Sequence, residues 1–145
     1  MNNQFRMKIS AKAENVAFIR SCISAFCVGL NPSLEQLEEI KTSSSEAITN
    51  AIVHAYPNND TNSYIWVEVR IENTTLTIIV EDEGVGIDDI SQAIQPFFTT
   101  KQDEEHSGMG FTLINSFMDG VDIISTKDKG TKVVMQKNIV EKENV

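Results

Sequence analysis

The sequence is short of cysteine, of basic residues and of long hydrophobic runs, and each shortage excludes a class of protein. Its two cysteines, Cys22 and Cys27, lie five residues apart. They lack the C-x-x-C spacing of redox and zinc motifs, so we expect both to be small buried residues of a helix. The 12 basic residues are outnumbered by 21 acidic ones, which gives a net charge of -9. Because nucleic-acid binding needs clustered Lys and Arg, this balance argues against a nucleic-acid binder. It permits a basic partner, or a ligand whose charge is neutralised by a metal ion.

Hydrophobic stretches are also short. None reaches the roughly 18 uninterrupted apolar residues of a membrane-spanning helix, and the first segment, MNNQFRMKISAKAEN, has no apolar signal core. We therefore expect a cytoplasmic protein. Its 145 residues suit a single domain over residues 1–145. A domain of that size buries about two-thirds of the surface of its unfolded chain and needs no disulfide or metal to fold.

Hydrophobic periodicity predicts the order strand, two helices, two strands, loop, helix, two strands. The strands are expected at residues 4–10, 64–72, 76–82, 121–126 and 130–137, and the main helices at 14–30, 33–56 and 108–119, with a short helix at 88–95. Ser33 followed by Gln36 has the form of a capping box. This order predicts an α+β, two-layer sandwich with helices on one face of a mixed, mainly antiparallel sheet. The tail, residues 138–145, is expected to fray.

The stretch SSEAITNAIVHAY carries two polar residues, Glu46 and Asn50, in an otherwise apolar helical pattern. At about 100° per residue they share a narrow polar row beside the apolar face. The small residues Ala47 and Ala51 lie next to this row and leave room for a ligand. Alone, such a row is best interpreted as the solvated edge of a helix. It indicates a site only if other segments converge on it.

Three other segments carry suitable chemistry. Asp82 ends the strand LTIIVED, where a carboxylate can accept a hydrogen bond from the amine of adenine and would repel the carbonyl of guanine. Gly84 and Gly86 let the main chain approach a flat ring or adopt positive φ. SGMGF, residues 107–111, opens a helix with glycines whose N–H groups attract phosphate. Each segment also has a plainer interpretation, as a strand-end turn or a flexible helix entry.

Three common nucleotide-binding motifs are missing. There is no Walker G-x-x-x-x-G-K-[ST] sequence, and the dinucleotide fingerprint fails because Leu113 stands where its third glycine belongs. The motif set of protein kinases is missing too.

Taken in order, E-x-x-x-N on a helix, D-x-G-x-G after a strand and G-x-G before a helix resemble the Bergerat (GHKL) ATP-binding family. This family includes gyrase B, histidine kinases, ninety-kilodalton heat-shock chaperones and mismatch-repair ATPases. Within it, SEAITNAIVHAY, DEGVGI, PFFTTK and SGMGFTLINSFMD are similar to anti-sigma factors of spore-forming bacteria that are also serine kinases. The resemblance runs from about residue 5 to residue 137 and implies the Bergerat type of sandwich.

The resemblance also implies roles for individual residues. Asn50 would ligate Mg²⁺ together with the ATP phosphates, since Mg²⁺ favours few protein ligands. Glu46 would be the general base on a substrate serine, Asp82 would hold adenine, and Arg20 would dock protein partners. Residues 96–107 would form the ATP lid. The other implied ATP contacts are Gly84, Gly86, Thr99, Thr100, Lys101, Ser107, Gly108, Met109, Gly110 and Thr131.

The implied function is twofold. The chain would transfer the γ-phosphoryl group of ATP to a serine of an anti-anti-sigma factor, and as a homodimer it would bind the sporulation sigma factor F. Two alternatives stay open. One is a sigma-factor-binding module with little kinase activity, for which ATP is a structural ligand. The other is a free ATPase or a detached histidine-kinase catalytic domain, which is weakened because no upstream helix pair carries an acceptor histidine.

One residue departs from the family pattern. Members of the family carry an arginine just before S-G-M-G, whereas this chain has His106. An arginine there would act in catalysis by stabilising charge on the phosphoryl group, and a histidine is often neutral near pH 7. We therefore expect ATP binding to survive, and phosphoryl transfer to be slower or more dependent on pH.

Overall fold

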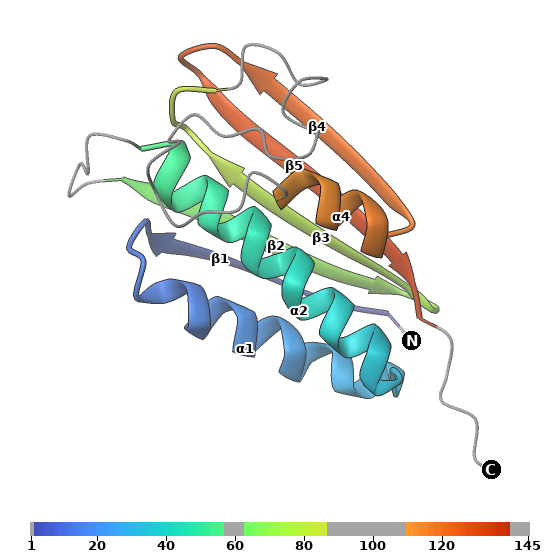
Figure 1. The fold of residues 1–145 in the computed structure, drawn as a ribbon. Coiled ribbons are helices and arrows are strands. Elements are labelled where there is room, and N and C mark those ends of the chain that lie inside the picture. The colour runs from blue at the N-terminus through green and yellow to red at the C-terminus, as the bar shows by residue number, and fades with distance from the viewer. Residues whose placement is uncertain (1, 57–62, 87–109, 140–145) are drawn as a thin grey trace.

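The computed structural model describes residues 2–56, 63–86 and 110–139. These residues form two layers, with the helices over one face of a five-stranded sheet (Figure 1). The strands are β1 (Asn2–Ser10), β2 (Tyr64–Glu72), β3 (Thr75–Asp82), β4 (Gly120–Thr126) and β5 (Gly130–Asn138). The helices are α1 (Asn15–Cys27), α2 (Leu34–Thr49) and α4 (Gly110–Phe117), with two short helical segments, η1 (Val28–Leu30) and η2 (Asn50–His54).

The strand order is β1-β2-β3-β5-β4, which leaves β3 in the middle of the sheet. This arrangement confirms the predicted two-layer α+β sandwich. Every strand pair among the described residues is antiparallel, whereas a mixed sheet was expected. The reason lies in the connections: β2 and β3, like β4 and β5, follow each other through tight turns. Between β1 and β2 the chain passes over the sheet twice, as α1 and then α2, so that β2 runs opposite to β1 (Figure 1).

The boundary between the first two helices follows the local sequence. α1 ends at Cys27, three residues earlier than predicted, and η1 completes it as a 3-10 turn. Asn31 then takes a left-handed conformation with φ 49°, which an Asn tolerates better than most residues. The capping box of α2 is confirmed: the Gln36 N–H donates to Ser33 Oγ, and the Ser33 N–H donates to Gln36 Oε1, both at 3.1 Å.

The second helix changes its winding at Asn50. Up to Thr49 it is α-helical, and η2 continues it as a π-helix in which the Ala55 N–H donates to the Asn50 carbonyl at 3.1 Å. The sequence predicted a regular helix as far as Pro57, because the residues of η2 do not distinguish one winding from the other. π-Turns are frequent at functional sites, and this one begins at a predicted site residue.

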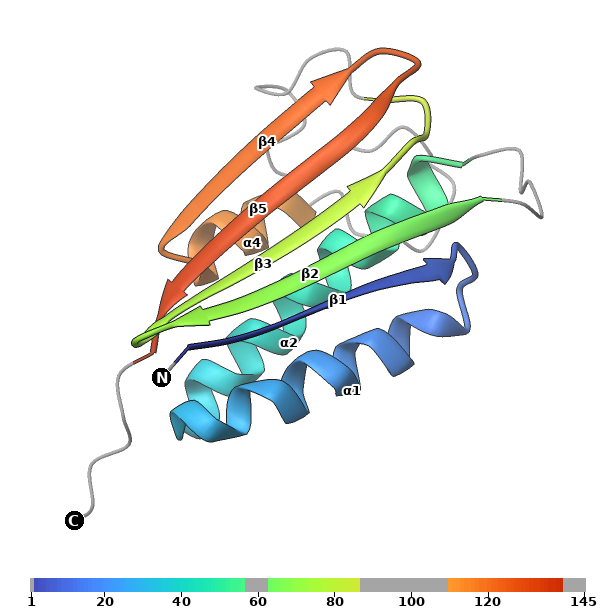
Figure 2. The same cartoon turned by 180° about the vertical axis from the view of Figure 1, so that it is seen from behind.

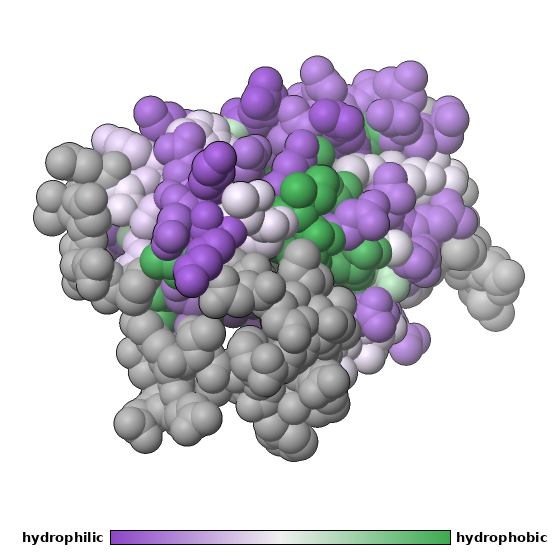
Figure 3. Space-filling model, turned by 90° about the horizontal axis from the view of Figure 1, so that it is seen from above, coloured by the Kyte–Doolittle hydropathy of each residue, from purple (hydrophilic) through white to green (hydrophobic). Residues whose placement is uncertain are grey.

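The hydrophobic core lies between the helices and the inner face of the sheet. Strand residues that point inward alternate with outward ones; the buried inward set includes Ile65, Val67, Val69, Ile71, Leu76, Ile78, Val80, Val133 and Met135. Ile19, Ile40, Ile48 and Ile114 meet them from the helices. The core is closed less completely at the β4 edge, where Val121 and Ile123 are only half-buried, and Figure 3 shows hydrophobic surface gathered on the side of β4 and α4.

Two expectations from the composition can be compared with the structure. Both cysteines are free; Cys27 is buried, which raises the pKa of its thiol to about 12, and Cys22 is half-buried. Within the three described ranges, no helix is both long and apolar enough to cross a membrane.

The end of the last strand is more ordered than predicted. Asn138 was assigned to a frayed tail, but its N–H donates to Asp119 Oδ2 at 2.6 Å. Ile139 is only 2% exposed, and its N–H donates to the Thr74 carbonyl at 2.8 Å. The prediction is therefore wrong for these two residues, because pairing with β3 and burial of Ile139 hold them in place. Residues 140–145 lie outside the described part of the chain.

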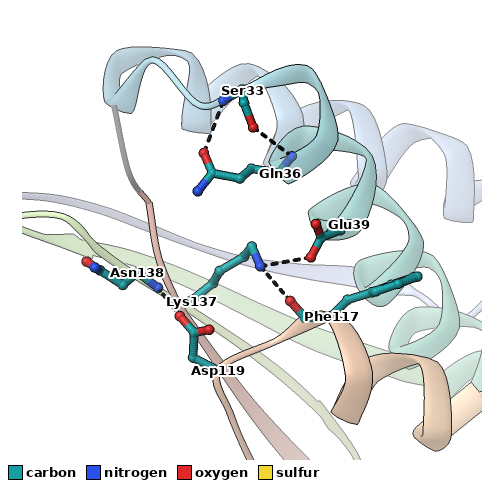
Figure 4. A network of polar contacts seen from close by, with 7 residues as sticks. All are labelled: Ser33, Gln36, Glu39, Phe117, Asp119, Lys137 and Asn138. Carbon is teal, nitrogen blue, oxygen red and sulfur yellow. Dashed lines mark hydrogen bonds and ion pairs between the residues drawn. The ribbon is translucent and has the colours of Figure 1, made fainter. Parts of the chain in front are cut away.

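A buried lysine connects β5 to two helices (Figure 4). Lys137 occupies an inward position of β5, and its ammonium group donates to Glu39 Oε2 of α2 at 3.0 Å and to the Phe117 carbonyl at 2.5 Å. Phe117 is the last residue of α4, so the positive charge also lies at the negative end of the helix dipole. The lysine thus fixes the C-terminal end of α4 relative to α2.

Replacing Glu39 with Gln is expected to lower the free energy of unfolding by about 2 kcal/mol, because the buried ammonium group loses its charged partner. Urea unfolding measures the change. Glu38→Gln is the matched control, since the Glu38–Lys41 pair is exposed and its loss should change stability by less than about 0.5 kcal/mol. Equal effects of the two substitutions would contradict the role given to Lys137.

Candidate functional site

Asp82 is the best-defined group of the candidate site. It ends β3 on the inner face of the sheet and is only 6% exposed. Its Oδ1 accepts two backbone hydrogen bonds, from the Gly84 N–H at 2.9 Å and from the Thr131 N–H at 3.2 Å. Within the described residues, Oδ2 accepts no hydrogen bond. The carboxylate is therefore fixed by one oxygen, and the other remains able to accept a hydrogen bond from a ligand amine, as adenine requires.

Burial changes the acidity of this carboxyl group. Desolvation raises the pKa of Asp82 to about 6 from an ordinary value near 3.8, although the hydrogen bonds from Gly84 and Thr131 act in the opposite direction. A raised pKa means that ionising Asp82 is unfavourable in the folded protein. A ligand that donates a hydrogen bond to Oδ2 would recover part of this free energy.

Asp82 should make the stability of the ligand-free protein depend on pH. Because its pKa in the folded state lies above that in the unfolded chain, the folded state binds the proton more tightly. The free energy of unfolding then falls as the pH rises from about 4 to about 6. Two pK units correspond to about 3 kcal/mol. Urea unfolding of the wild type and of Asp82→Asn should show this loss in the wild type alone; parallel pH profiles would contradict the shifted pKa.

Glycine is needed at positions 84 and 86, after Asp82, for two different structural reasons. Gly86 has φ +76°, the positive φ expected from the sequence. Gly84 instead lies against the end of η2: a Cβ there would be 2.1 Å from the Ala55 carbonyl oxygen. The Val85 N–H donates to the same oxygen at 2.9 Å. The sequence predicted close approach to a ligand ring at these glycines; the approach seen at Gly84 is to the backbone that follows Asn50.

Gly84→Ala is expected to destabilise the fold by about 3 kcal/mol, because the added methyl group would overlap backbone atoms that cannot move aside cheaply. Gly120→Ala is the matched control. The nearest atom to a Cβ there is in the Gln136 side chain at 3.7 Å, an ordinary contact, so its effect should stay below about 1 kcal/mol. Thermal or urea unfolding distinguishes the two variants. A tolerated Gly84→Ala would show that the packing of the loop on η2 is loose.

Tyr56 also holds the loop that follows Asp82, and no sequence pattern identified this tyrosine. Its hydroxyl donates to the Tyr64 carbonyl at 2.7 Å and accepts the Glu83 N–H at 2.8 Å. Desolvation by burial raises the pKa of Tyr56, so the hydroxyl stays protonated and able to donate. The residue thereby joins the end of η2 to β2 and to the residue after Asp82. A tyrosine at the end of a helix carries no sequence signal for this role.

Thr131 lies on the other side of Asp82, at the start of β5. It is 8% exposed, and besides its N–H bond to Asp82 its hydroxyl lies 2.8 Å from Ser125 Oγ. Ser125 Oγ in turn donates to the Gly130 carbonyl at 3.2 Å. Thr131 thus contacts Asp82, while its predicted contribution to adenine binding through water stays a prediction.

On the helical layer, Glu46 and Asn50 lie four residues apart, and both are half-buried. The Asn50 side chain makes no hydrogen bond within the described residues, so its amide oxygen is able to ligate a cation, and its chemistry fits Mg²⁺. Five residues later, the Ala55 carbonyl contacts Gly84 and Val85. The structure therefore brings the end of this helix to the loop after Asp82, while a shared ligand site of Glu46, Asn50 and Asp82 stays a prediction.

The third predicted segment is only partly described. Gly110 is the first residue of α4, and α4 packs against α2 (Figure 1). The other predicted residues of the lid and of the helix entry lie outside the described part of the chain: Thr99, Thr100, Lys101, His106, Ser107, Gly108 and Met109. Arg20 is on α1, where its Nη1 donates to Ser45 Oγ of α2 at 3.5 Å. It therefore contacts the residue before Glu46.

A family model described as a histidine kinase-like ATPase domain matches residues 9–137. The chain belongs to this family. Among curated proteins, this ATPase domain is 48% identical over 141 residues to an anti-sigma F factor of Geobacillus kaustophilus, covering 97% of this chain and 96% of the relative. It is 47% identical over 145 residues to the anti-sigma F factor of Geobacillus stearothermophilus, covering 100% and 99%. A third anti-sigma F factor, from Clostridium perfringens, is 44% identical and covers 96% and 99%.

A solved structure confirms the fold independently of sequence. The RsbU and RsbW domains of a Mycobacterium tuberculosis protein superpose with a TM-score of 0.68 at 13% identity, over 94% of this chain. This chain spans only 32% of that longer protein, and such low identity supports the shared fold alone. Membership of the histidine kinase-like ATPase family implies ATP binding, which agrees with an Asp82 Oδ2 that accepts no hydrogen bond within the described residues.

Proposed function

We propose that this chain is an anti-sigma factor that binds sigma factor F and that, with Mg²⁺ and ATP, phosphorylates a serine of an anti-anti-sigma factor. The observation that carries the nucleotide part is the buried Asp82 carboxylate, which the described residues hold through Oδ1 alone. The near full-length likeness to three proteins named anti-sigma F factor supports the sigma-factor part.

In this proposal Asp82 selects the base. Its Oδ2 accepts a hydrogen bond from the exocyclic amine of adenine, and it repels the carbonyl that guanine presents at the same place. Thr131 and Gly84 keep the carboxylate oriented through Oδ1. Gly86 gives the loop its left-handed turn, so that the main chain can pass close to the ring.

Asn50 and Glu46 act at the phosphate end. The Asn50 amide oxygen would ligate Mg²⁺, and one turn earlier Glu46 would accept the proton of the serine hydroxyl as general base. ATP supplies the transferable γ-phosphoryl group when bound. Phosphoryl transfer is catalysed mainly by positioning the reacting groups and by neutralising the charge of the phosphates. N–H groups from the segment that leads into α4 would contribute the neutralisation.

The proposed partners are sigma factor F, an anti-anti-sigma factor and a second copy of this chain. The printed names of the relatives support the first, and the family resemblance supports the other two. Arg20 is proposed to dock a protein partner, since it lies on the outer helix α1 and its guanidinium group makes one long hydrogen bond, to Ser45, among the described residues.

Incubation with Mg²⁺, ATP and a candidate anti-anti-sigma protein, followed by mass spectrometry, tests the kinase. We expect one phosphoserine on the acceptor and none on an acceptor whose serine is replaced by Ala. ATP binding without any transfer would contradict the kinase and favour the sigma-factor-binding module. His106, in place of the expected arginine, is the sequence feature that favours this second candidate.

A further inference from the structure

A short polar row crosses one end of the inner face of the sheet. Asp82, Thr131 and Ser125 are neighbours on β3, β5 and β4 in the strand register. Figure 2 shows that β3 and β4 end, and β5 begins, at this end of the sheet. The next inward row contains only apolar residues: Val67, Val80, Val133 and Ile123. Ser125 thus lies one strand beyond the two polar residues already placed in the candidate site.

Two hydrogen bonds fix the direction of the Ser125 hydroxyl. Its oxygen lies 3.2 Å from the Gly130 carbonyl oxygen and 2.8 Å from Thr131 Oγ1. A carbonyl oxygen can only accept, so Ser125 donates its one hydroxyl proton to Gly130. Towards Thr131 the Ser125 oxygen can then only accept, and the Thr131 hydroxyl must be the donor. The proton of Thr131 therefore points towards β4, away from Asp82.

The Gly130 carbonyl, which receives the Ser125 proton, is held in place. A Cβ at Gly130 would lie 2.1 Å from the Asp82 carbonyl oxygen, so the start of β5 packs tightly against the end of β3. The turn between β4 and β5 is also bonded to the loop after Asp82, because the Asp128 N–H donates to the Val85 carbonyl at 2.7 Å. The acceptor that orients Ser125 is therefore part of the same rigid corner as Asp82.

We propose that Ser125 is a positioning residue for base recognition: it accepts a hydrogen bond from Thr131, so that the Thr131 hydroxyl offers only its lone pairs to a bound nucleotide. The inference rests on the proposed ATP site and adds a second determinant of its specificity. Asp82 Oδ2 is an acceptor as well when the carboxylate is ionised. Two neighbouring acceptors favour a donor at position 6 of a purine, the amine of adenine, and disfavour the carbonyl of guanine or hypoxanthine.

The same preference holds if a water molecule stands between Thr131 and the base. A water that is bound by both Thr131 Oγ1 and Asp82 Oδ2 donates its two hydrogens to these acceptors. Towards the base it can then only accept, so it suits an amine and not a carbonyl. Without Ser125 the Thr131 hydroxyl could turn and donate, and a carbonyl at position 6 would no longer be disfavoured on this side.

The relative affinities for ATP and ITP test this role, because the hypoxanthine of ITP has a carbonyl where adenine has its amine. Calorimetric titration with Mg²⁺, by competition for the weaker ligand, gives the ratio of the two affinities. In Ser125→Ala we expect the preference for ATP to fall about tenfold, mainly through tighter binding of ITP, since Thr131 can now donate to the carbonyl. The affinity for ATP should change by less than about threefold.

Three further variants show whether Ser125 acts through Thr131. Ser125→Thr keeps a hydroxyl on the same carbon and should keep the wild-type ratio. Thr126→Ala removes a hydroxyl from the next position of β4, which is exposed, and should also keep it. Thr131→Val removes the group through which Ser125 is proposed to act. Adding Ser125→Ala to Thr131→Val should therefore leave the ratio as Thr131→Val alone sets it.

The outcomes separate this inference from the function on which it rests. A wild type that prefers ATP, with an unchanged or larger preference in Ser125→Ala, would overturn the role of Ser125 and leave the ATP site standing. Equal losses of both affinities would do the same, because they indicate a structural role alone, as would an effect of Ser125→Ala that persists beside Thr131→Val. A wild type that binds neither nucleotide, or binds both equally, would overturn this inference together with base selection by Asp82.

Discussion

Asp82→Asn is expected to weaken ATP binding by about 100-fold or more while leaving the fold at least as stable at neutral pH. The substitution keeps Oδ1 as acceptor for the Gly84 and Thr131 N–H groups. In place of Oδ2 it puts an amide NH₂, which faces the adenine amine donor to donor and leaves both groups unsatisfied. Replacing the charged, desolvated carboxylate removes the unfavourable ionisation that raises its pKa. Calorimetric titration and thermal unfolding measure the two effects.

Asp119→Asn is the control for this substitution. Asp119 is exposed, and its Oδ2 accepts the N–H of Asn138, the last residue of β5, a bond that an Asn side chain can keep. Its ATP affinity should match that of the wild type. If Asp82→Asn also bound ATP with wild-type affinity, this carboxylate would not recognise adenine, and the adenine-binding site would have to lie elsewhere.

Glu46→Gln should lower the rate of serine phosphorylation by about 10²- to 10⁴-fold, the usual contribution of a general base. The amide has nearly the same shape but cannot take the proton of the serine hydroxyl. ATP affinity should change little, because in the proposal the nucleotide is held by Asp82, Asn50 and the entry to α4. A phosphorylation time course at saturating ATP, paired with a binding titration, separates the two quantities.

Glu38→Gln, an exposed change on the same helix, should leave both quantities unchanged. An unaltered rate in Glu46→Gln would remove the base assignment. A large loss of ATP affinity would instead show that Glu46 contacts the nucleotide or its metal ion.

Most of the fold follows from local patterns in the sequence. Alternation predicted all five strands to within a few residues, because each has one face in the core and one outside. The capping box located the start of α2, since Ser33 and Gln36 satisfy each other's backbone groups. Local patterns do not fix the relative direction of distant strands, so the purely antiparallel pairing was missed. They also missed the order at Ile139, which depends on contacts with Thr74 and the core.

The candidate site was predictable where chemistry and turn geometry coincide in sequence. Asp82 and Gly86 were identified because a strand-end carboxylate and a positive φ leave short-range signals. The π-turn at Asn50 was not, because the residues of η2 do not distinguish this winding from an α-helical one. Tyr56 was missed because its two hydrogen-bond partners, Tyr64 and Glu83, are brought to it only by the folded sheet.

The central claim is that this site holds ATP through Asp82, with Mg²⁺ on Asn50, and calorimetric titration of the wild type tests it most directly. We expect one ATP per chain, affinity that drops sharply when EDTA removes Mg²⁺, and GTP bound at least about 100-fold more weakly. ATP uptake that ignores Mg²⁺, equal affinity for GTP, or no uptake at all would contradict the account.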